Sequence, residues 1–225
     1  MTDLLLIGGA TPEMLERLEL VLERFVGACL SLKAKKCVLF ATTVDFLGFR
    51  LSQRGIEVSP EKVEAIARID STAINNITAV RSFLGAASFY RKHIKGFASK
   101  ARALTDLTKQ GVDVAVESQK QPAQDAIKQL KEALTTAPVL ALPQWDRQFI
   151  VHTDASITGL GAVMCQQDDD GNERPISYWG RVLTPAESHY SVSELELLAI
   201  VSCFKQWRPY LWSPAGKKFL LRVDH

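Results

Sequence analysis

Hydrophobic and polar residues follow a helical period over much of the N-terminal and middle parts of the chain. Apolar residues at three- and four-residue steps follow Thr11 and Pro12, and again follow Ser59 and Pro60. A Ser or Thr directly before Pro is typical of a helix start, because the hydroxyl caps the first turn and proline takes the first helical position. Both segments are therefore predicted to be helices.

Two strand-like runs separate these helices. The runs Lys36–Phe40 and Val44–Ser52 are mainly apolar and lie on either side of Ala41–Thr43. They predict a hairpin whose turn is at Ala41–Thr43.

Further helices are predicted in the middle of the chain. The segment Ile77–Gly111 has the apolar spacing of two helices divided near Gly96. Residues 111–124 are polar and lack a period, which predicts a loop or linker. The segment Gln124–Thr136 predicts one more helix, which ends before Pro138.

The pattern changes near residue 149, where short apolar runs replace the helical period. Four strands and one helix are predicted from here onward. In order, they are strands at Phe149–Val151, Leu160–Met164 and Arg174–Leu183, a helix at Ser191–Leu211, and a strand at Lys217–His225. We therefore expect two structural regions that join near Leu140–Gln148.

Three carboxylates occupy related positions in the second region. Asp154 follows the first strand, Asp224 lies near the end of the last strand, and Glu196 lies over the apolar stripe of the helix. If the first and last strands are neighbours and the helix packs on them, the three carboxylates converge. Grouped carboxylates repel one another unless a cation neutralises them, and oxygen ligands suit Mg²⁺. The alternatives are that Asp154 only ends a strand and that Glu194 holds the helix position.

Charge is distributed unevenly along the chain, although the net charge is only +2. Residues 71–110 hold seven Lys or Arg residues against one Asp, whereas residues 146–225 hold eight basic residues against ten acidic ones. A basic segment favours contact with nucleic-acid phosphates, and a solvated helix face is the alternative interpretation.

Other features exclude some classes of protein. No apolar run is long enough to span a membrane and no signal peptide precedes the first helix, so we expect an intracellular protein without a membrane partner, in a cytoplasmic particle or the nucleus. The four cysteines lack a metal-type spacing and are interpreted as reduced, mostly buried thiols. His152 and His189 are interpreted as structural residues, and Asp168–Asp170 as a solvated turn.

Longer motifs follow one another in a recognisable order. They are "LSLKAKKCVLFATTVDFLGFRLSQRGIEVSPEKVEAI", "VRSFLGAASFYRKHIKGFASKARALTDLTK", "LKEALTTAPVLALPQWDRQFIVHTDAS", "PISYWGRVLTPAESHYSVSELELLAIV" and "FLLRVDH". In that order they resemble the end of the palm, the thumb, the connection and the RNase H domain of reverse transcriptases from gypsy-class LTR retrotransposons. Because the resemblance is collinear over nearly the whole chain, the chain is identified as a segment of such a Pol polyprotein.

The resemblance implies a fold of the α+β and α/β classes in four parts. They are the end of the palm with a primer-contacting hairpin at 1–58, a helical thumb at 59–110, a connection at 111–145, and the first part of an RNase H-like mixed-sheet domain at 146–225.

The resemblance also implies a metal-dependent nuclease site. Asp154, Glu196 and Asp224 match the first three metal-binding acids of the family, and Glu196 is preferred to Glu194 because the family's acid directly precedes a Leu-x-Ala-Ile run. The implied cofactor is Mg²⁺, with Mn²⁺ as a substitute. The implied partners are an RNA–DNA hybrid or primer–template duplex and the remainder of the polyprotein, and the parent activity is endonucleolytic cleavage of RNA in the hybrid.

Duplex-contacting residues are implied at two further places. Phe46, Leu47 and Gly48 match the primer-contacting hairpin, where glycine permits close approach of the backbone to the primer. The thumb would contact the duplex backbone through Arg91, Lys92, Lys95 and Lys100.

Two departures from the family lower the activity that we expect. Thr2 stands where the first of two adjacent polymerase acids belongs, which leaves Asp3 as the residual polymerase acid and predicts no polymerase activity. The sequence stops just after Asp224, before the family's fourth acid and catalytic His, so we expect little or no cleavage by the chain alone. The alternative function is an inactive remnant that binds nucleic acid without sequence preference.

Overall fold

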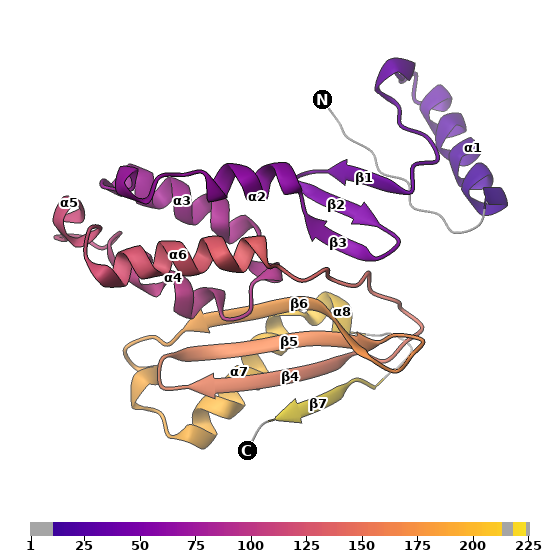
Figure 1. Cartoon of the computed structure of the whole chain (residues 1–225). Coiled ribbons are helices and arrows are strands. Elements are labelled where there is room, and N and C mark those ends of the chain that lie inside the picture. The colour runs from indigo at the N-terminus through magenta and orange to yellow at the C-terminus, as the bar shows by residue number, and fades with distance from the viewer. Residues whose placement is uncertain (1–10, 213–217, 224–225) are drawn as a thin grey trace.

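The computed structural model describes residues 11–212 and 218–223, which form two β-sheets and two sets of helices (Figure 1). The first part contains helix α1 and a three-stranded antiparallel sheet in the order β1-β2-β3. These elements are α1 (Thr11–Gly27), β1 (Thr43–Phe46), β2 (Phe49–Ser52) and β3 (Gly55–Val58), with a short 3₁₀ turn at Ala34–Lys36.

The first hairpin turns at a different place from the one predicted. The predicted turn at Ala41–Thr43 was wrong, because Lys36–Phe40 forms no strand and Val44–Ser52 itself makes both strands of the hairpin. The two-residue turn is Leu47-Gly48, with φ of 49° and 83°. Two consecutive positive φ values are typical of a type I′ turn, whose twist matches that of the flanking strands.

A group of helices follows the first sheet and shares one hydrophobic core. The helices are α2 (Pro60–Ala67), α3 (Ile77–Phe89), α4 (Phe97–Asp106), α5 (Val114–Glu117) and α6 (Gln121–Thr135), with 3₁₀ turns η2 (Ser71–Ala73) and η3 (Arg91–His93). The predicted helix start at Ser59 and the predicted division near Gly96 are confirmed. Gly96 has a φ of 67° directly before α4, a left-handed conformation that glycine adopts at little cost.

The loop predicted at residues 111–124 was wrong in part. Asp113 caps α5 by accepting hydrogen bonds from the backbone N–H groups of Ala115 and Val116, at 3.1 and 3.4 Å. Helix α6 begins soon afterwards at Gln121. The inner face of α6, including Leu130, is buried in the same core as Phe83 of α3 and Leu104 of α4. Residues 59–110 and 111–135 therefore pack as one unit.

The second part of the chain is a four-stranded mixed sheet with a helix on one face. The strands are β4 (Ile150–Ser156), β5 (Gly159–Gln167), β6 (Glu173–Val182) and β7 (Leu220–Val223), in the order β6-β5-β4-β7. The prediction of four strands and one main helix here is confirmed, and β4 and β7 are parallel neighbours. Helices α7 (Val192–Gln206) and α8 (Arg208–Leu211) lie behind the sheet in the view of Figure 1.

The two parts of the chain are in direct contact along β6. Helix α4 and the η3 turn pack against this strand, and the Arg91 guanidinium donates a hydrogen bond to the carbonyl of Gly180 at 2.9 Å. The linker between the two parts also contacts the first sheet: Leu140 pairs with Ile56 of β3 through two backbone hydrogen bonds of 2.7 and 2.9 Å. The backbone N–H of the next residue, Ala141, donates to the carbonyl of Pro175 in β6 at 2.7 Å. The linker is thus tied to both sheets.

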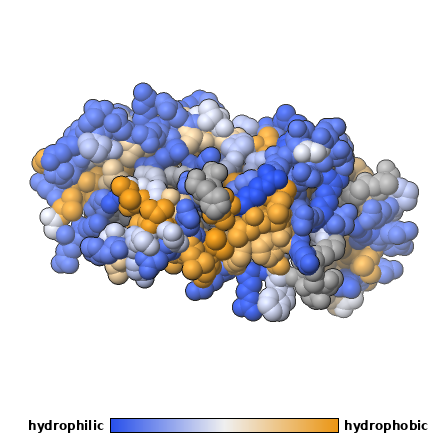
Figure 2. All heavy atoms as spheres, turned by 90° about the horizontal axis from the view of Figure 1, so that it is seen from below, coloured by the Kyte–Doolittle hydropathy of each residue, from blue (hydrophilic) through white to orange (hydrophobic). Residues whose placement is uncertain are grey.

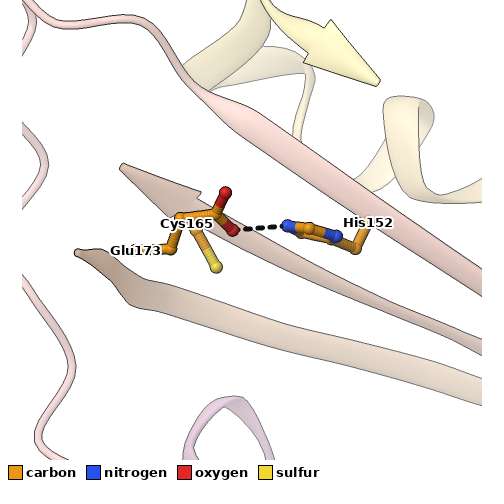
Figure 3. Close-up of side chains that lie close together, drawn as sticks. All are labelled: His152, Cys165 and Glu173. Carbon is orange, nitrogen blue, oxygen red and sulfur yellow. Dashed lines mark hydrogen bonds and ion pairs between the residues drawn. The ribbon is translucent and has the colours of Figure 1, made fainter. Parts of the chain in front are cut away.

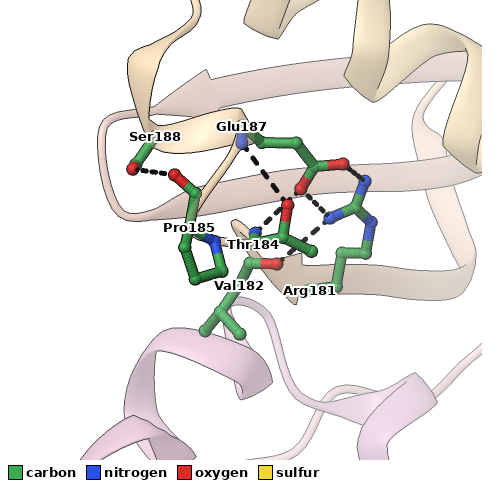
Figure 4. A network of polar contacts seen from close by, with 6 residues as sticks. All are labelled: Arg181, Val182, Thr184, Pro185, Glu187 and Ser188. Carbon is green, nitrogen blue, oxygen red and sulfur yellow. Dashed lines mark hydrogen bonds and ion pairs between the residues drawn. The ribbon is translucent and has the colours of Figure 1, made fainter.

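A polar network closes the segment between β6 and α7 (Figure 4). The two guanidinium nitrogens of Arg181 donate to the two carboxylate oxygens of Glu187 at 2.7 and 2.8 Å. The backbone N–H of Thr184 donates to the same carboxylate at 2.8 Å. Hydrogen bonds from Arg181 and then from Thr184 lower the pKa of Glu187 from its ordinary value of 4.5 to about 2. This network ties the end of β6 to the segment that leads into α7.

Replacing Glu187 by Gln is expected to lower the free energy of unfolding near pH 7 by about 1–2 kcal/mol, because the bidentate ion pair with Arg181 is lost. Because the pKa is lowered in the folded protein, the difference from wild type is full above pH 4.5 and shrinks as the pH falls towards 2. Urea unfolding at pH 7 and at lower pH measures both effects.

A matched control is Glu132→Gln on α6. Its carboxylate is 62% exposed and lies 3.9 Å from Lys128, so the change is expected to be within about 0.5 kcal/mol. An equal loss in the two variants, or a Glu187→Gln loss that does not depend on pH, would contradict the stabilising role of the network.

Candidate metal-binding and nucleic-acid-binding sites

The sequence-predicted acids lie on elements that are neighbours in space. Asp154 is the fifth residue of β4, and Glu196 is in the N-terminal half of α7. Ala155, next to Asp154, and Leu195, next to Glu196, pack in one hydrophobic cluster. The predicted packing of this helix on the first strand is therefore confirmed at the level of the backbone.

The parallel pairing of β4 with β7 reaches the residues just before two of the acids. Thr153 is the register partner of Val223, and these residues directly precede Asp154 and Asp224. Asp224 itself lies outside the described residues, as does Asp3. The predicted neighbourhood of the first and last strands is confirmed, whereas the position of the Asp224 carboxylate stays a prediction.

The two described acids differ in burial and have no polar partner of their own. Asp154 is exposed and Glu196 is half-buried. Within 11–212 and 218–223, neither carboxylate takes part in a hydrogen bond or an ion pair. Carboxylate oxygens that are not engaged by the protein are the donor type that a hard divalent cation such as Mg²⁺ takes. The donor chemistry therefore fits such an ion.

Side-chain alternation places Asp154 relative to the helix. Val151 packs against Cys203 of α7 and Ala155 packs against Leu195, so the odd-numbered residues of β4 face the helix. Because successive side chains of a strand point to opposite faces, His152 and Asp154 lie on the other face. Asp154 and Glu196 thus reach a common ion only around the end of the strand.

The rival acid on the helix has another role. The Glu194 carboxylate accepts hydrogen bonds from the backbone N–H and the hydroxyl of Ser191, both at 2.8 Å, and Ser191 in turn caps the helix. These bonds, chiefly the backbone one, lower the pKa of Glu194. This reciprocal arrangement is a capping box, which stabilises a helix start. The geometry therefore favours Glu196 over Glu194 as the free carboxylate.

The predicted primer-contacting residues form the tip of the β1–β2 hairpin. Leu47 is 62% exposed and has a positive φ, while Phe46 is half-buried. The Gly48 carbonyl accepts hydrogen bonds from the Tyr90 hydroxyl at 3.2 Å and from the Ser59 backbone N–H at 3.1 Å. A Cβ atom at Gly48 would lie 3.0 Å from the Tyr90 hydroxyl oxygen. The close approach that glycine permits here is thus one to Tyr90 of this chain.

Of the predicted basic residues, Arg91 and Lys100 make hydrogen bonds within the chain, and Lys92 and Lys95 are exposed. The Arg91 guanidinium donates to Gly180 and lies 5.8 Å from the centre of the Phe97 ring. Lys100 is half-buried and donates to the carbonyl of Lys95 at 2.8 Å. Lys92 and Lys95 are therefore better placed than Arg91 to meet phosphates.

The structure also brings together three side chains that the sequence did not group. His152 of β4, Cys165 of β5 and Glu173 of β6 lie close to one another (Figure 3). The signal is the antiparallel register, which pairs Ile150 with Cys165 and so places His152 near the thiol. Linear spacing of cysteines and histidines does not show this. By contrast, Asp168–Asp170 is confirmed as a turn, in which the Asp168 carboxylate accepts backbone hydrogen bonds.

A membrane-spanning role finds no support in the helices that the structure describes, none of which is both long and apolar enough to cross a bilayer.

Residues 120–221 match the family described as the RNase H-like domain found in reverse transcriptase. This part of the chain is therefore similar to that domain. The chain's relatives include the retrovirus-related Pol polyproteins from transposons 297 and opus of Drosophila melanogaster, each 34% identical over 99% and 93% of this chain. The Tf2-3 transposon polyprotein of Schizosaccharomyces pombe is 30% identical over 100% of it. The predicted resemblance to retrotransposon Pol polyproteins is confirmed, and the chain spans 20%, 21% and 16% of these relatives.

Similar solved structures support the mixed α+β fold. The dRH form of the foamy viral protease-reverse transcriptase in complex with double-stranded DNA has a TM-score of 0.81 at 21% identity, over 96% of this chain and 37% of that one. The same kind of protein in complex with an RNA/DNA hybrid has a TM-score of 0.78 at 21% identity, over 96% of this chain and 28% of that one. At this identity the likeness shows the fold alone, which in this chain is a mixed α+β fold with two sheets.

Proposed function

We propose that this chain is the part of a retrotransposon reverse transcriptase that runs from the end of the palm through the thumb and connection into an RNase H domain. The proposed activity of the parent protein is cleavage of RNA in RNA–DNA hybrids. The observation that carries it is the junction of β4, β7 and α7, where the residues next to Asp154 and Glu196 pack together and Val223 pairs with Thr153. The family match over 120–221 supports the same assignment.

Asp154, Glu196 and Asp224 are the proposed ligands of divalent metal ions, with Mg²⁺ as the natural ion and Mn²⁺ as a substitute. When bound, such ions stabilise the charge that develops on the phosphate during cleavage. The chain's own contribution is to leave the carboxylates of Asp154 and Glu196 without a hydrogen-bond or ion-pair partner among the residues that the structure describes, so that they stay available to an ion. Ser191 engages Glu194, so that acid does not compete as a ligand, and the charge of Arg181 is paired with Glu187.

We also propose that three lysines after α3 and the hairpin tip contact the duplex. Lys92, Lys95 and Lys100 would bind phosphates without reading base sequence, while Leu47 at the exposed tip would contact the primer strand. The solved relatives of similar fold that bind double-stranded DNA and hybrid support this proposal. Hybrid selectivity would come from duplex shape and 2′-hydroxyl contacts.

Replacing Lys92, Lys95 and Lys100 together by Ala is expected to weaken binding to a hybrid and to make the dependence of log K on log salt shallower by about 2–3, because each phosphate contact contributes about 0.9 to that slope. Fluorescence anisotropy over a series of salt concentrations measures the slope. The matched control replaces Lys33, Lys35 and Lys128, which are exposed elsewhere, and is expected to leave the slope unchanged. Equal slopes in both triple variants would contradict the thumb assignment.

The rest of a Pol polyprotein is the proposed protein partner. Seen from below, the molecule shows a patch of apolar side chains near its middle (Figure 2). The exposed hydrophobic residues include Leu197 and Val201 of α7 and Leu220 of β7, and β7 is an edge strand of the described sheet. An exposed strand edge beside apolar side chains is a surface that proteins normally cover. Pol relatives about five times longer than this chain offer a covering segment.

An alternative function is supported by the same basic segment. A chain that binds duplexes through its lysines but cuts nothing would be a nucleic-acid-binding remnant. Substitution of Asp154 in a longer protein separates the two functions.

A further inference from the structure

The face of the sheet that α7 leaves uncovered holds a compact group of three potential ligands. His152, Cys165 and Glu173 each offer one ligand atom, and these atoms all lie within 4.8 Å of one another. The His152 Nε2 atom lies 2.7 Å from a carboxylate oxygen of Glu173. Figure 3 shows the three side chains on three adjacent strands, β4, β5 and β6. Rigid strands hold all three ligands, so the group is set by the fold.

The chemistry of this group points to a transition metal. Imidazole nitrogen, thiolate sulfur and carboxylate oxygen are the three ligand types of Zn²⁺, whereas Mg²⁺ does not take thiolate. In a tetrahedral zinc site the ligand atoms lie about 3.5 Å apart, given bonds of about 2.0–2.3 Å. Reaching that geometry needs shifts of up to about 1.3 Å, because the widest pairs must close from at most 4.8 Å and the His152–Glu173 pair must open from 2.7 Å. A thiolate and a carboxylate also carry the two negative charges that match a divalent ion.

A neighbouring cation orients the carboxylate. The Arg222 guanidinium lies 2.8 Å from Oε1 of Glu173, which leaves Oε2 directed at His152. A hydrogen-bonding partner outside the ligand set is a common feature of metal sites, because it fixes the ligand in place. Arg222 thus holds one oxygen of Glu173 and keeps the other near His152 and Cys165.

Access from solvent is sufficient for an ion to enter. The side chains of His152 and Glu173 are 32% and 26% exposed, while the Cys165 residue is buried. Burial and the nearby Glu173 raise the pKa of the Cys165 thiol to about 11 in the absence of an ion. The thiol is therefore inert without a metal, because the thiolate is the reactive form.

We propose that His152, Cys165 and Glu173 form a Zn²⁺ site on the uncovered face of the RNase H-like sheet, separate from the acids Asp154 and Glu196. His152 and Asp154 share this face, two residues and about 7 Å apart along β4. An ion bound here ties together β4, β5 and β6. Because it binds the folded chain, it raises the stability of the sheet and fixes the strand that carries Asp154.

Cobalt(II) is the probe for the first experiment, because a Co²⁺–thiolate bond gives a charge-transfer absorption in the near ultraviolet. The purified chain carries Cys29→Ser and Cys37→Ser, which remove the two exposed thiols. We expect one Co²⁺ per chain with this absorption, and its displacement by Zn²⁺. Cys165→Ser is expected to abolish the absorption, and the matched control Cys203→Ser, a second buried cysteine on α7, to keep it.

Zinc affinity, measured by competition with a chromophoric chelator, keeps the proposal testable if a cysteine variant folds poorly. His152→Gln and Glu173→Gln are each expected to weaken Zn²⁺ binding roughly tenfold or more, since each removes a ligand. Urea unfolding without metal checks that these variants are folded. The proposal is overturned if the chain gives no thiolate absorption with Co²⁺, if Cys165→Ser retains it, or if both glutamine variants bind Zn²⁺ as the wild type does.

Discussion

Replacing Asp154 by Asn is expected to lower hybrid cleavage by roughly a hundredfold or more, because it removes a proposed metal ligand and even partners outside a ligand set contribute 10–100-fold. The protein for this assay is the chain joined to the downstream part of the transposon 297 polyprotein, a relative that is 34% identical to it. Binding to the hybrid is expected to change little, since the lysines proposed to contact phosphates lie elsewhere. Cleavage of a labelled hybrid with Mg²⁺ measures the rate, and anisotropy measures binding.

Asp146→Asn is the matched control for this substitution. Asp146 is an exposed acid just before the same strand, and its replacement is expected to leave the rate unchanged. If the joined protein cuts equally well with Asn at 154, Asp154 is only a strand end. If the joined protein binds the hybrid with wild-type affinity but cuts in neither form, the binding-remnant alternative is favoured.

Replacing Gly55 by Ala is expected to lower the free energy of unfolding by at least about 3 kcal/mol. This loss combines a backbone penalty of about 1–3 kcal/mol with the cost of a steric clash. Gly55 begins β3 with a φ of 130°, and a Cβ atom there would lie 2.1 Å from the carbonyl oxygen of Leu140. That carbonyl accepts the Ile56 backbone hydrogen bond, so relief of the clash would break the bridge between the first sheet and the linker. Urea unfolding measures the loss.

Gly171→Ala is the control for the backbone contribution alone. Gly171 has a φ of 82°, and a Cβ atom there would meet nothing within 4 Å. The expected loss is about 1 kcal/mol, from the positive φ only. If the two alanine variants unfold at the same urea concentration, the contact between Gly55 and Leu140 is not part of the folded protein.

Local signals in the sequence predicted those elements whose ends are marked by a specific residue. Gly96 divides α3 from α4 because it adopts a left-handed conformation there. The helix predicted from Ser191 onward is α7, and the structure shows that a capping box of Ser191 and Glu194 starts it. The succession of strands and helix along the chain after residue 149 followed from the short apolar runs and the helical spacing. In these places the local chemistry and the tertiary fold agree.

The first hairpin could not be placed in this way. Its turn is Leu47-Gly48, and Leu47 has a φ of 49° that a leucine rarely adopts. Tertiary contacts stabilise the turn, because Tyr90 and Ser59 both donate to the Gly48 carbonyl. A sequence pattern does not contain these distant donors, so it predicts the turn at Ala41–Thr43 instead.

The candidate sites show the same limit. The identity of Asp154 and Glu196 followed from motif and helical spacing, but the face on which Asp154 lies follows from the packing of its neighbours Val151 and Ala155. The His152–Cys165–Glu173 group depends on strand register across three strands. Register is set by turns and packing rather than by linear spacing, so a cluster of this kind emerges only from the structure.

The most direct test of the proposed function is whether Asp154 and Glu196 hold one metal ion. Mn²⁺ bound per chain is measured by electron paramagnetic resonance for Asp154→Asn, Glu196→Gln and the double variant, all in a Cys165→Ser background that removes the thiol ligand. If the two acids share an ion, each single substitution abolishes its binding and the double variant loses no more than either single one. If the single losses are independent and add in the double variant, or if neither substitution changes Mn²⁺ binding, the two acids do not form a common metal site.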